Sequence, residues 1–314
     1  MLRLDGFEAL KDFNSRNGCV ATIGVFDGVH LGHQAVFQKV FERAAAQGQT
    51  PAVVTFSGHP KSLLRGVAPA TITSLEHRLR LFERLGFEVC LVLEFTDALR
   101  DLSAEHFLRE HLIPELGLKE LILGFDSKFG KGRGGTFEML EPLSKELGIG
   151  IAEVKPMRLD GRAVSSTAIR EAVQLGELRK SQKMLGRRVS VLGTVIHGDG
   201  RGKELDFPTA NLDLHHELRP PDGVYAVFAQ LGETLHPAVA NLGQRPTFGS
   251  PGPSVEVHIL GFEGNLYGRN LEVHFLTKIR SEVEFPDTVA FQAQVAEDCK
   301  KAEALCAGAS SSQG

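Results

Sequence analysis

The pattern of secondary-structure signals changes near residue 185, and this change constrains the fold more than any other feature of the chain. Before that point, short apolar runs alternate with amphipathic helical stretches. After it, short strands follow one another with Gly, Pro and Asp between them. Apolar strands separated by helices are typical of a parallel sheet covered on both faces. Closely spaced strands with turns are typical of an antiparallel barrel or sandwich. We therefore predict an α/β domain followed by a β domain.

The element boundaries follow from the same periodicities. In the first region we predict strands at Cys19–Val25, Ala52–Phe56, Val89–Phe95 and Glu120–Leu123. Helices are predicted at Gln34–Gln47, Leu75–Leu85, Ala104–Leu116, Phe137–Leu147, Ser166–Leu175 and Glu177–Leu185. The second region contains strands at Val189–His197, Gly223–Gln230, Leu235–Leu242, Ser254–Leu260 and Asn270–Lys278, then a helix at Thr288–Ala304. The resulting domains are residues 1–185 and 186–306, with a disordered tail at 307–314.

Composition excludes several classes of protein. The 314 residues include 35 Lys and Arg against 39 Asp and Glu, a balance that does not indicate nucleic acid or an anionic membrane as a partner. No apolar run approaches the roughly 18 residues of a membrane span. The four cysteines lack C-x-x-C spacing, so neither a disulfide framework nor a thiolate zinc site is indicated. We expect a soluble cytoplasmic protein, and its oligomeric state stays open.

A glycine-rich segment, G-V-F-D-G-V-H-L-G-H, joins the first strand to the first helix. Ligands of parallel sheets bind at the carboxyl ends of strands, and the start of a helix offers N–H groups to an anion. Two imidazoles three residues apart can donate hydrogen bonds to a phosphate. An isolated H-x-x-H pair is more often a surface pair or part of a zinc site, but the glycines and the lack of further ligands nearby favour a phosphate site. Its candidate residues are Gly24, Phe26, Asp27, His30, Gly32 and His33.

Two further segments of the first domain have hydroxyl or basic side chains at the start of a helix or after a strand. V-S-S-T-A-I-R begins a helix, where the hydroxyls are either simple caps or ligands of a polyphosphate that would also neutralise the arginine. Its candidates are Ser165, Ser166, Thr167 and Arg170. The loop G-F-D-S-K-F-G-K-G-R-G-G, which includes Asp126, is either a flexible basic loop or the site of a second substrate.

The second domain contains G-D-G-R-G-K-E-L-D-F-P-T-A-N, in which alternating glycines precede a proline, a hydroxyl and an amide. The glycine N–H groups suit phosphates, and the oxygens of Thr209 and Asn211 suit Mg²⁺. Glu256 is a carboxylate in a strongly β-forming strand, which fits a general base. Strand alternation alone favours the solvent face for this residue. The candidate ATP-binding residues are Gly198, Gly200, Gly202, Lys203, Thr209 and Asn211.

These motifs and their order resemble the prokaryotic bifunctional riboflavin kinase/FMN adenylyltransferase (FAD synthetase) family. G-V-Y at Gly223–Tyr225, R-P-T-F at Arg245–Phe248 and L-Y-G at Leu266–Gly268 extend the resemblance through the second domain. It implies a Rossmann-like nucleotidyltransferase domain with helices on both faces of a parallel sheet. It also implies a six-stranded antiparallel barrel with a C-terminal helix. The implied activities are phosphorylation of riboflavin by ATP to FMN and adenylylation of FMN by ATP to FAD and pyrophosphate.

The resemblance also implies roles for individual residues. His30 and His33 would bind the ATP phosphates and stabilise the adenylyl transition state, and Asp126 would help to place FMN. Ser165, Ser166, Thr167 and Arg170 would hold the departing phosphates. In the barrel, Thr209 and Asn211 would bind Mg²⁺ and ATP, and Glu256 would be the base for the riboflavin 5′-hydroxyl. Riboflavin, FMN and ATP with Mg²⁺ would be the small-molecule partners, with no tightly bound cofactor.

Two positions depart from the family pattern. Asp206 stands where the family usually has glycine, and Gly261 stands where aspartate is common. Aspartate at 206 adds a negative charge near the expected ATP phosphates. One alternative is therefore an FMN adenylyltransferase whose barrel binds flavin without phosphorylating it. The other alternative is a non-catalytic flavin or nucleotide sensor.

Replacing Asp206 by glycine separates the first alternative from a working kinase. If the barrel is active, Asp206→Gly will change FMN formation from riboflavin only modestly. FMN formation that occurs in the variant alone would instead identify a degenerate kinase. The measurement is chromatographic separation of riboflavin, FMN and FAD after incubation with Mg–ATP.

Overall fold

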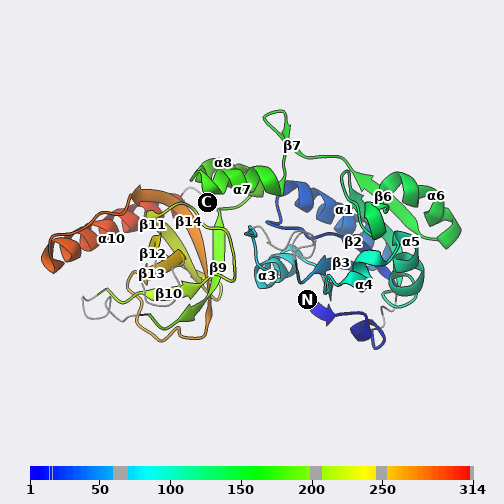
Figure 1. Ribbon diagram of the computed structural model, residues 1–314, viewed down its shortest axis with the longest axis horizontal. Helices are drawn as coiled ribbons and strands as arrows, with labels where there is room; N and C mark the ends of the chain where they lie inside the picture. The colour runs from blue at the N-terminus through cyan, green and yellow to red at the C-terminus, as the bar shows by residue number, and fades with distance from the viewer. Residues whose placement is uncertain (14, 16, 59–69, 199–206, 245–252, 312–314) are drawn as a thin grey trace. The chain divides into compact units, whose positions relative to one another are not determined.

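The computed structural model describes residues 1–13, 15, 17–58, 70–198, 207–244 and 253–311, and Figure 1 shows its helices and strands. The chain forms two compact units, Met1–Ser166 and Thr167–Gly314. The first unit is a sheet with helices, and the second is a closed barrel with a long C-terminal helix. Among the described residues, no helix is both long enough and apolar enough to cross a membrane.

The first unit contains a six-stranded parallel sheet with the strand order β1-β4-β3-β2-β5-β6. Its strands are β1 (Leu2–Asp5), β2 (Cys19–Ile23), β3 (Thr50–Phe56), β4 (Val89–Leu93), β5 (Leu118–Gly124) and β6 (Gly150–Val154). A small hairpin is formed by β7 (Arg158–Leu159) and β8 (Arg162–Ala163). From β2, the chain adds β3 and then β4 on one side of β2, whereas β5 and β6 lie on its other side. The strand order therefore reverses at β2, which is where open parallel sheets bind ligands.

The helices cover both faces of this sheet, which explains its apolar strands. The helical segments are η1 (Glu8–Leu10), α1 (Leu31–Gln47), α3 (Leu75–Leu85), α4 (Asp97–Asp101), α5 (Ala104–Phe107), η2 (Leu108–Leu112), η3 (Lys131–Arg133) and α6 (Phe137–Leu147). Phe37 of α1 and Phe82 of α3 pack on one face with Val20 of β2. Phe107 and Leu140, from α5 and α6, pack on the other face with Ala21. Successive residues of β2 thus enter different cores, as the pleat requires.

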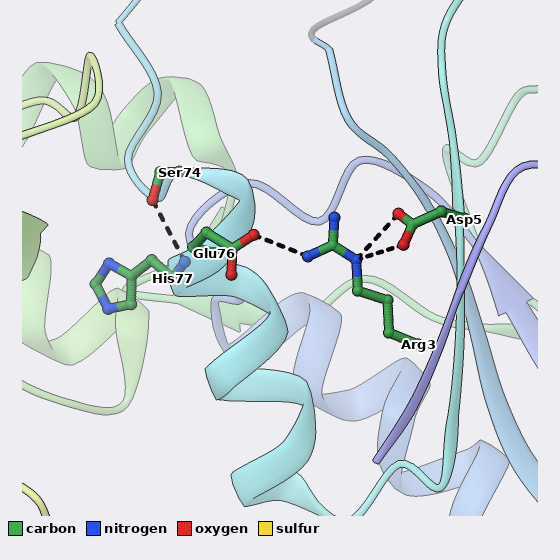
Figure 2. A network of polar contacts seen from close by, with 5 residues as sticks. All are labelled: Arg3, Asp5, Ser74, Glu76 and His77. Atoms are coloured by element: carbon green, nitrogen blue, oxygen red, sulfur yellow. Dashed lines mark hydrogen bonds and ion pairs between the residues drawn. The ribbon is translucent and has the colours of Figure 1, made fainter. Parts of the chain in front are cut away.

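The N-terminal strand is tied to α3 by polar contacts at the edge of the sheet, shown in Figure 2. Arg3 Nη1 lies 2.9 Å from Glu76 Oε1, and Arg3 Nε lies 2.9 Å from Asp5 Oδ2. The Ser74 hydroxyl caps α3 by accepting a hydrogen bond from the backbone N–H of His77. Exposed ion pairs of this kind add little stability, and the cap contributes about 1 kcal/mol. Their main effect is to hold the beginning of α3, which also contacts the site described below.

The second unit contains a closed barrel with the strand order β10-β13-β12-β11-β14-β9. The strands are β9 (Ser190–Ile196), β10 (Ala210–Asp213), β11 (Gly223–Leu231), β12 (Thr234–Gln244), β13 (Pro253–Ile259) and β14 (Asn270–Arg280). Helices α7 (Ser166–Gln174) and α8 (Leu178–Leu185) precede them, and α10 (Thr288–Ser311) follows. Val224, Ala226 and Val239 pack against Ala302 of α10, so their side chains lie on the outer face of the barrel.

The expected fold class is confirmed, with corrections to single elements. β1, β6 and β10 were not predicted: the first two flank the sheet, and β10 is only four residues long. The predicted helix Ala104–Leu116 is interrupted by the π-helical turn η2. The tail predicted to be disordered from residue 307 is helical as far as Ser311, because α10 continues through an alanine-rich stretch without proline. The division of the chain into two domains at residue 185 stays a prediction.

A buried ion pair between Arg280 and Asp298 fixes α10 to the barrel. Their side chains are 20% and 2% exposed, and Arg280 Nη2 lies 2.8 Å from Asp298 Oδ2. We expect Asp298→Ala to lower the free energy of unfolding of the second unit by about 3 kcal/mol, because it leaves a half-buried guanidinium without its carboxylate. Urea titration followed by tyrosine fluorescence will measure this, since both tyrosines, Tyr225 and Tyr267, lie in that unit and the chain has no tryptophan.

The neighbouring Glu297 provides the control for this prediction. It pairs with Lys301 on the exposed side of the same helix, at 2.6 Å. Glu297→Ala should leave the urea midpoint of the tyrosine signal unchanged, because exposed pairs are screened by solvent. Equal effects of the two substitutions would contradict the assignment of the Arg280–Asp298 pair as the anchor of α10.

Candidate active sites

The predicted histidine segment lies between β2 and α1, at the carboxyl edge of the sheet where the strand order reverses. Phe26 and Val29 have positive φ angles of 52° and 43°, which are costly for residues with bulky side chains. The turn is held by the Val29 N–H donating to the Phe26 carbonyl and by Gln34 Nε2 donating to the Val29 carbonyl. This strained turn directs the chain sharply into α1, whose first N–H groups point towards the site.

His30 is the N-cap of α1, and its Nδ1 accepts a hydrogen bond from the backbone N–H of His33 at 3.3 Å. Because Nδ1 accepts, the ring proton lies on Nε2, which leaves Nε2 as a donor. The imidazoles of His30 and His33 are stacked with centroids 3.5 Å apart, and the edge of Phe26 packs against His33. A Cβ at Gly32 would come within 3.2 Å of the His30 ring, so the glycine provides the space for this arrangement.

Asp27 is 3% exposed, and its carboxylate binds backbone groups of another segment. Asp27 Oδ1 accepts from the Thr73 N–H at 3.0 Å, and Oδ2 accepts from the Ile72 N–H at 3.2 Å. The Thr73 hydroxyl in turn accepts from the Gly28 N–H at 2.9 Å. Asp27 therefore holds this segment, residues 24–33, here called the histidine turn, against the residues that lead into α3. Sequence reasoning missed Thr73, which lies in no recognisable motif.

The serine-rich segment contacts the same turn. The Ser166 hydroxyl donates to the backbone carbonyl of Asp27 at 3.0 Å, so Ser166, the last residue of the first unit, lies beside the histidine turn. Thr167 and Arg170 follow one and four residues later on α7. The first unit thus brings together His30, His33 and Ser166, three of the residues that the sequence predicts to act on phosphates.

A cavity of about 520 Å³ opens at the carboxyl ends of β2 and β5. Its walls include two edge-to-face aromatic pairs: Phe56 with Phe95 and Phe107 with Phe129. Arg100, Lys128, Arg133 and Asp126 supply charge at its lining. The Ser127 hydroxyl accepts from the Gly124 N–H and closes the turn that presents Asp126. Aromatic walls with a few charged groups suit a planar ligand that has an anionic end.

A buried arginine lies behind this edge of the sheet. Arg78 of α3 is 4% exposed, and its guanidinium donates to the carbonyls of Val25 and Phe56 and to the Thr55 hydroxyl. Val25 and Phe56 both line the cavity. Arg78 therefore joins the ends of β2 and β3 where they form the cavity wall, a role that sequence periodicity does not indicate.

In the barrel, strand pairing places three polar side chains in one row. Glu256 of β13 is directly opposite Asn211 of β10 on one side and Asn241 of β12 on the other. Directly paired residues share a face of the sheet. Asn241 is two residues from Val239, which packs under α10, so the row lies on the outer face of the barrel. The outward orientation of Glu256 matches strand alternation, and the two flanking asparagines make it a polar site.

Gly198 packs closely against the Asn211 side chain. A Cβ at residue 198 would overlap the Asn211 amide, so only glycine leaves room for it. Thr209 is half-buried and immediately precedes β10. The other expected ATP-binding residues, Gly200, Gly202 and Lys203, lie outside the described residues, as does Asp206.

The described residues contain no group of three or more His, Cys, Asp or Glu side chains that could hold a metal ion. The Asn211 amide, directly opposite Glu256, and the Thr209 hydroxyl two residues earlier in the chain are oxygen ligands of the kind that Mg²⁺ accepts. Cysteine chemistry is not favoured, because burial raises the pKa of all four cysteine thiols, that of Cys90 to about 12.

Two family models match this chain. The FAD synthetase model matches residues 12–168, and the riboflavin kinase model matches residues 185–306. A protein of Haemophilus influenzae named bifunctional riboflavin kinase/FMN adenylyltransferase is 38% identical over 291 residues, which cover 92% of this chain and 94% of that protein. The protein of the same name from Escherichia coli K12 is 37% identical over 285 residues, 90% of this chain and 91% of that protein.

The chain belongs to the bifunctional riboflavin kinase/FMN adenylyltransferase family. A crystal structure from Streptococcus pneumoniae, named as a macrolide-efflux protein, has a TM-score of 0.82 and 29% identity. It covers 96% of this chain and 99% of its own, so both units share its fold. Because the family relationship spans both units, the alternatives of a lone adenylyltransferase and a non-catalytic sensor are not favoured.

The packing of Gly198 against Asn211 gives a prediction for the kinase half of this family member. Gly198→Ala should displace the Asn211 amide and reduce kcat/KM for riboflavin phosphorylation by about 100-fold, the typical cost of a misplacement near 1 Å. FAD formation from FMN should stay unchanged, because that reaction belongs to the other unit. Gly308→Ala is the control, since nothing lies within 4 Å of a Cβ at that position. An unchanged phosphorylation rate in Gly198→Ala would contradict the packing argument.

Proposed function

We propose that this chain converts riboflavin to FAD in two ATP-dependent steps, with the residues named above in the roles that the family resemblance implies. Family membership over both units carries the proposal. The barrel phosphorylates riboflavin to FMN, and the α/β unit transfers the adenylyl group of a second ATP to FMN. Because both steps consume ATP, we place them in the cytoplasm.

For adenylyl transfer, the ATP phosphates bind at the histidine turn and the start of α1. A phosphate oxygen of FMN attacks the α-phosphorus of ATP, and the bond from that phosphorus to the departing pyrophosphate breaks. His30 and His33, whose rings are stacked, bind the ATP phosphates and donate hydrogen bonds to the oxygens on which negative charge grows, His30 from its Nε2. Ser165, Ser166, Thr167 and Arg170 bind the departing phosphates. Asp27 acts through the turn that it holds, since its carboxylate already binds backbone N–H groups.

The cavity at the ends of β2 and β5 is the proposed FMN site. Its phenylalanine pairs would contact the flavin ring, and Asp126 would hydrogen-bond to its polar edge. Arg100, Lys128 and Arg133 would attract the FMN phosphate. The cavity adjoins Gly24, the first residue of the histidine turn, so the FMN phosphate and the ATP phosphates would meet at that residue.

For riboflavin phosphorylation, the Glu256 carboxylate takes the proton of the 5′-hydroxyl. The resulting oxygen attacks the γ-phosphorus of ATP, and ADP leaves. Thr209 and Asn211 would hold Mg²⁺, which neutralises charge on the ATP phosphates when bound. This reaction depends mainly on positioning and charge stabilisation. The strand pairing that places the proposed base, Glu256, opposite the proposed magnesium ligand Asn211 is therefore the observation that most directly supports the kinase site.

Substitutions in the two sites should affect the two reactions separately. We expect His30→Ala to reduce FAD formation from FMN by about 100-fold or more, because it removes a donor to the transition state. Glu256→Gln should reduce FMN formation from riboflavin by about 100-fold or more, because the amide cannot accept the proton. Each variant should leave the other reaction intact. The measurement is the initial rate of each reaction, started from riboflavin or from FMN and resolved by chromatography.

Measuring both reactions in each variant provides a control for folding. A variant that loses one reaction while the same preparation keeps the other has not lost its overall structure. Loss of both reactions in either variant would contradict the separation of the sites. A change of less than a few-fold in the targeted reaction would remove His30 or Glu256 from its proposed role.

A further inference from the structure

His258 makes a contact in the barrel that none of the roles above requires. It lies on β13, two residues after Glu256, so both side chains share the outer face. Its Nδ1 is 2.9 Å from the carbonyl oxygen of Pro208, and its ring packs perpendicular to Phe207 with centroids 5.6 Å apart. The imidazole therefore reaches the segment that leads into Thr209 and Asn211.

The direction of this hydrogen bond follows from its partner. A carbonyl oxygen only accepts, so the proton lies on Nδ1 of His258 and the imidazole donates. Pro208 lies two residues before Ala210, where the pairing of β10 with β13 begins. The Pro208 carbonyl is therefore beyond the ladder, and proline has no N–H with which to extend it. The imidazole continues the attachment of this segment to β13 beyond the last paired residue.

This contact bears directly on Thr209. Thr209 lies between Pro208, which His258 holds, and Ala210, which is paired with Val257. Both neighbours of Thr209 are thus attached to β13, the strand that also contains Glu256. These two attachments set the position of the Thr209 backbone relative to β13, and of the two only the His258 bond depends on a side chain.

We propose that His258 is a positioning residue of the kinase site, whose hydrogen bond to Pro208 holds residues 208–211 in the geometry that binds Mg–ATP. The proposal rests on the proposed function of the barrel and adds a residue that touches neither substrate nor metal. Its role is to limit the motion of the phosphate-binding segment before the nucleotide arrives.

Three substitutions at His258 separate this hydrogen bond from simple packing. His258→Asn keeps an N–H donor near the position of Nδ1, His258→Gln places the donor farther along the side chain, and His258→Leu removes it. We expect the leucine variant to raise KM for Mg–ATP by about fivefold to tenfold, the cost of one hydrogen bond. In the asparagine variant, KM for Mg–ATP should lie within about twofold of that of the unsubstituted protein. In the glutamine variant it should be raised as much as in the leucine variant. KM for riboflavin should stay unchanged in all three.

A second measurement requires neither metal nor nucleotide. Amide hydrogen exchange, measured by mass spectrometry on the ligand-free protein, should be faster in the peptide containing Thr209–Asn211 when His258 is leucine. His258→Asn should restore slow exchange in that peptide, because it restores the attachment of Pro208. Tyrosine fluorescence will show whether the leucine variant folds. If it does not, slower exchange of this peptide in His258→Asn than in His258→Gln tests the hydrogen bond to Pro208 instead.

His236 offers a matched control on the neighbouring strand β12. It is also a histidine on the barrel with a perpendicular aromatic contact, to Phe262 at 6.2 Å. His236→Leu should leave KM for Mg–ATP and the exchange of residues 209–211 unchanged. FAD formation from FMN by the same preparations should also be unchanged throughout.

The possible failures are distinguishable. The role of His258 would be overturned by an unchanged KM for Mg–ATP in His258→Leu. It would also be overturned if KM rose as much in His258→Asn as in His258→Leu. Either result would leave the kinase assignment in place. Full phosphorylation activity in Glu256→Gln would instead overturn the proposed site itself.

Discussion

Hydrogen-bonded pairing between strands that are distant in the sequence brings together the candidate residues of both sites. In the parallel sheet, β2 lies beside β5, so the histidine turn and the Asp126 turn meet at one edge. In the barrel, β13 lies between β10 and β12, so Glu256 is flanked by Asn211 and Asn241. Register matters because a shift of one residue would turn each side chain to the opposite face. The strand pairing that builds the two cores therefore also sets the distances between the candidate residues of each site.

Side chains outside the predicted motifs hold the segments that the ladders leave unpaired. Asp27 and Thr73 attach the histidine turn to the residues before α3, and Arg78 joins the ends of β2 and β3 at the cavity wall. Such buried polar groups are stabilising only when hydrogen-bonded, so each one specifies a single arrangement of its loop. In the barrel, an exposed hydrogen bond from His258 attaches the Pro208 carbonyl to β13. In both units, a side chain from a neighbouring segment holds a loop of the candidate site in place.

Sequence periodicity predicted the elements with long apolar runs and missed those that are short or irregular. The Val89–Leu93 strand and the Phe137–Leu147 helix were found because pattern and burial agree over several residues. The four residues of β10 follow a proline and have too little apolar character to be read as a strand without their partners. The π-helical turn Leu108–Leu112 keeps helical composition, so its changed hydrogen bonding leaves no signal in the sequence.

By itself, the sequence determined the two-part architecture, the positions of the glycine-rich turns and the residue types available for phosphate chemistry. Local patterns and spacing contain this information because they depend on neighbouring residues alone. Only the tertiary structure decided that Glu256 has asparagines on both sides, that Gly198 makes room for Asn211, and that His258 reaches Pro208. These contacts join residues from different strands and loops. Their distances arise from pairing and close packing, which no periodicity along a single segment records.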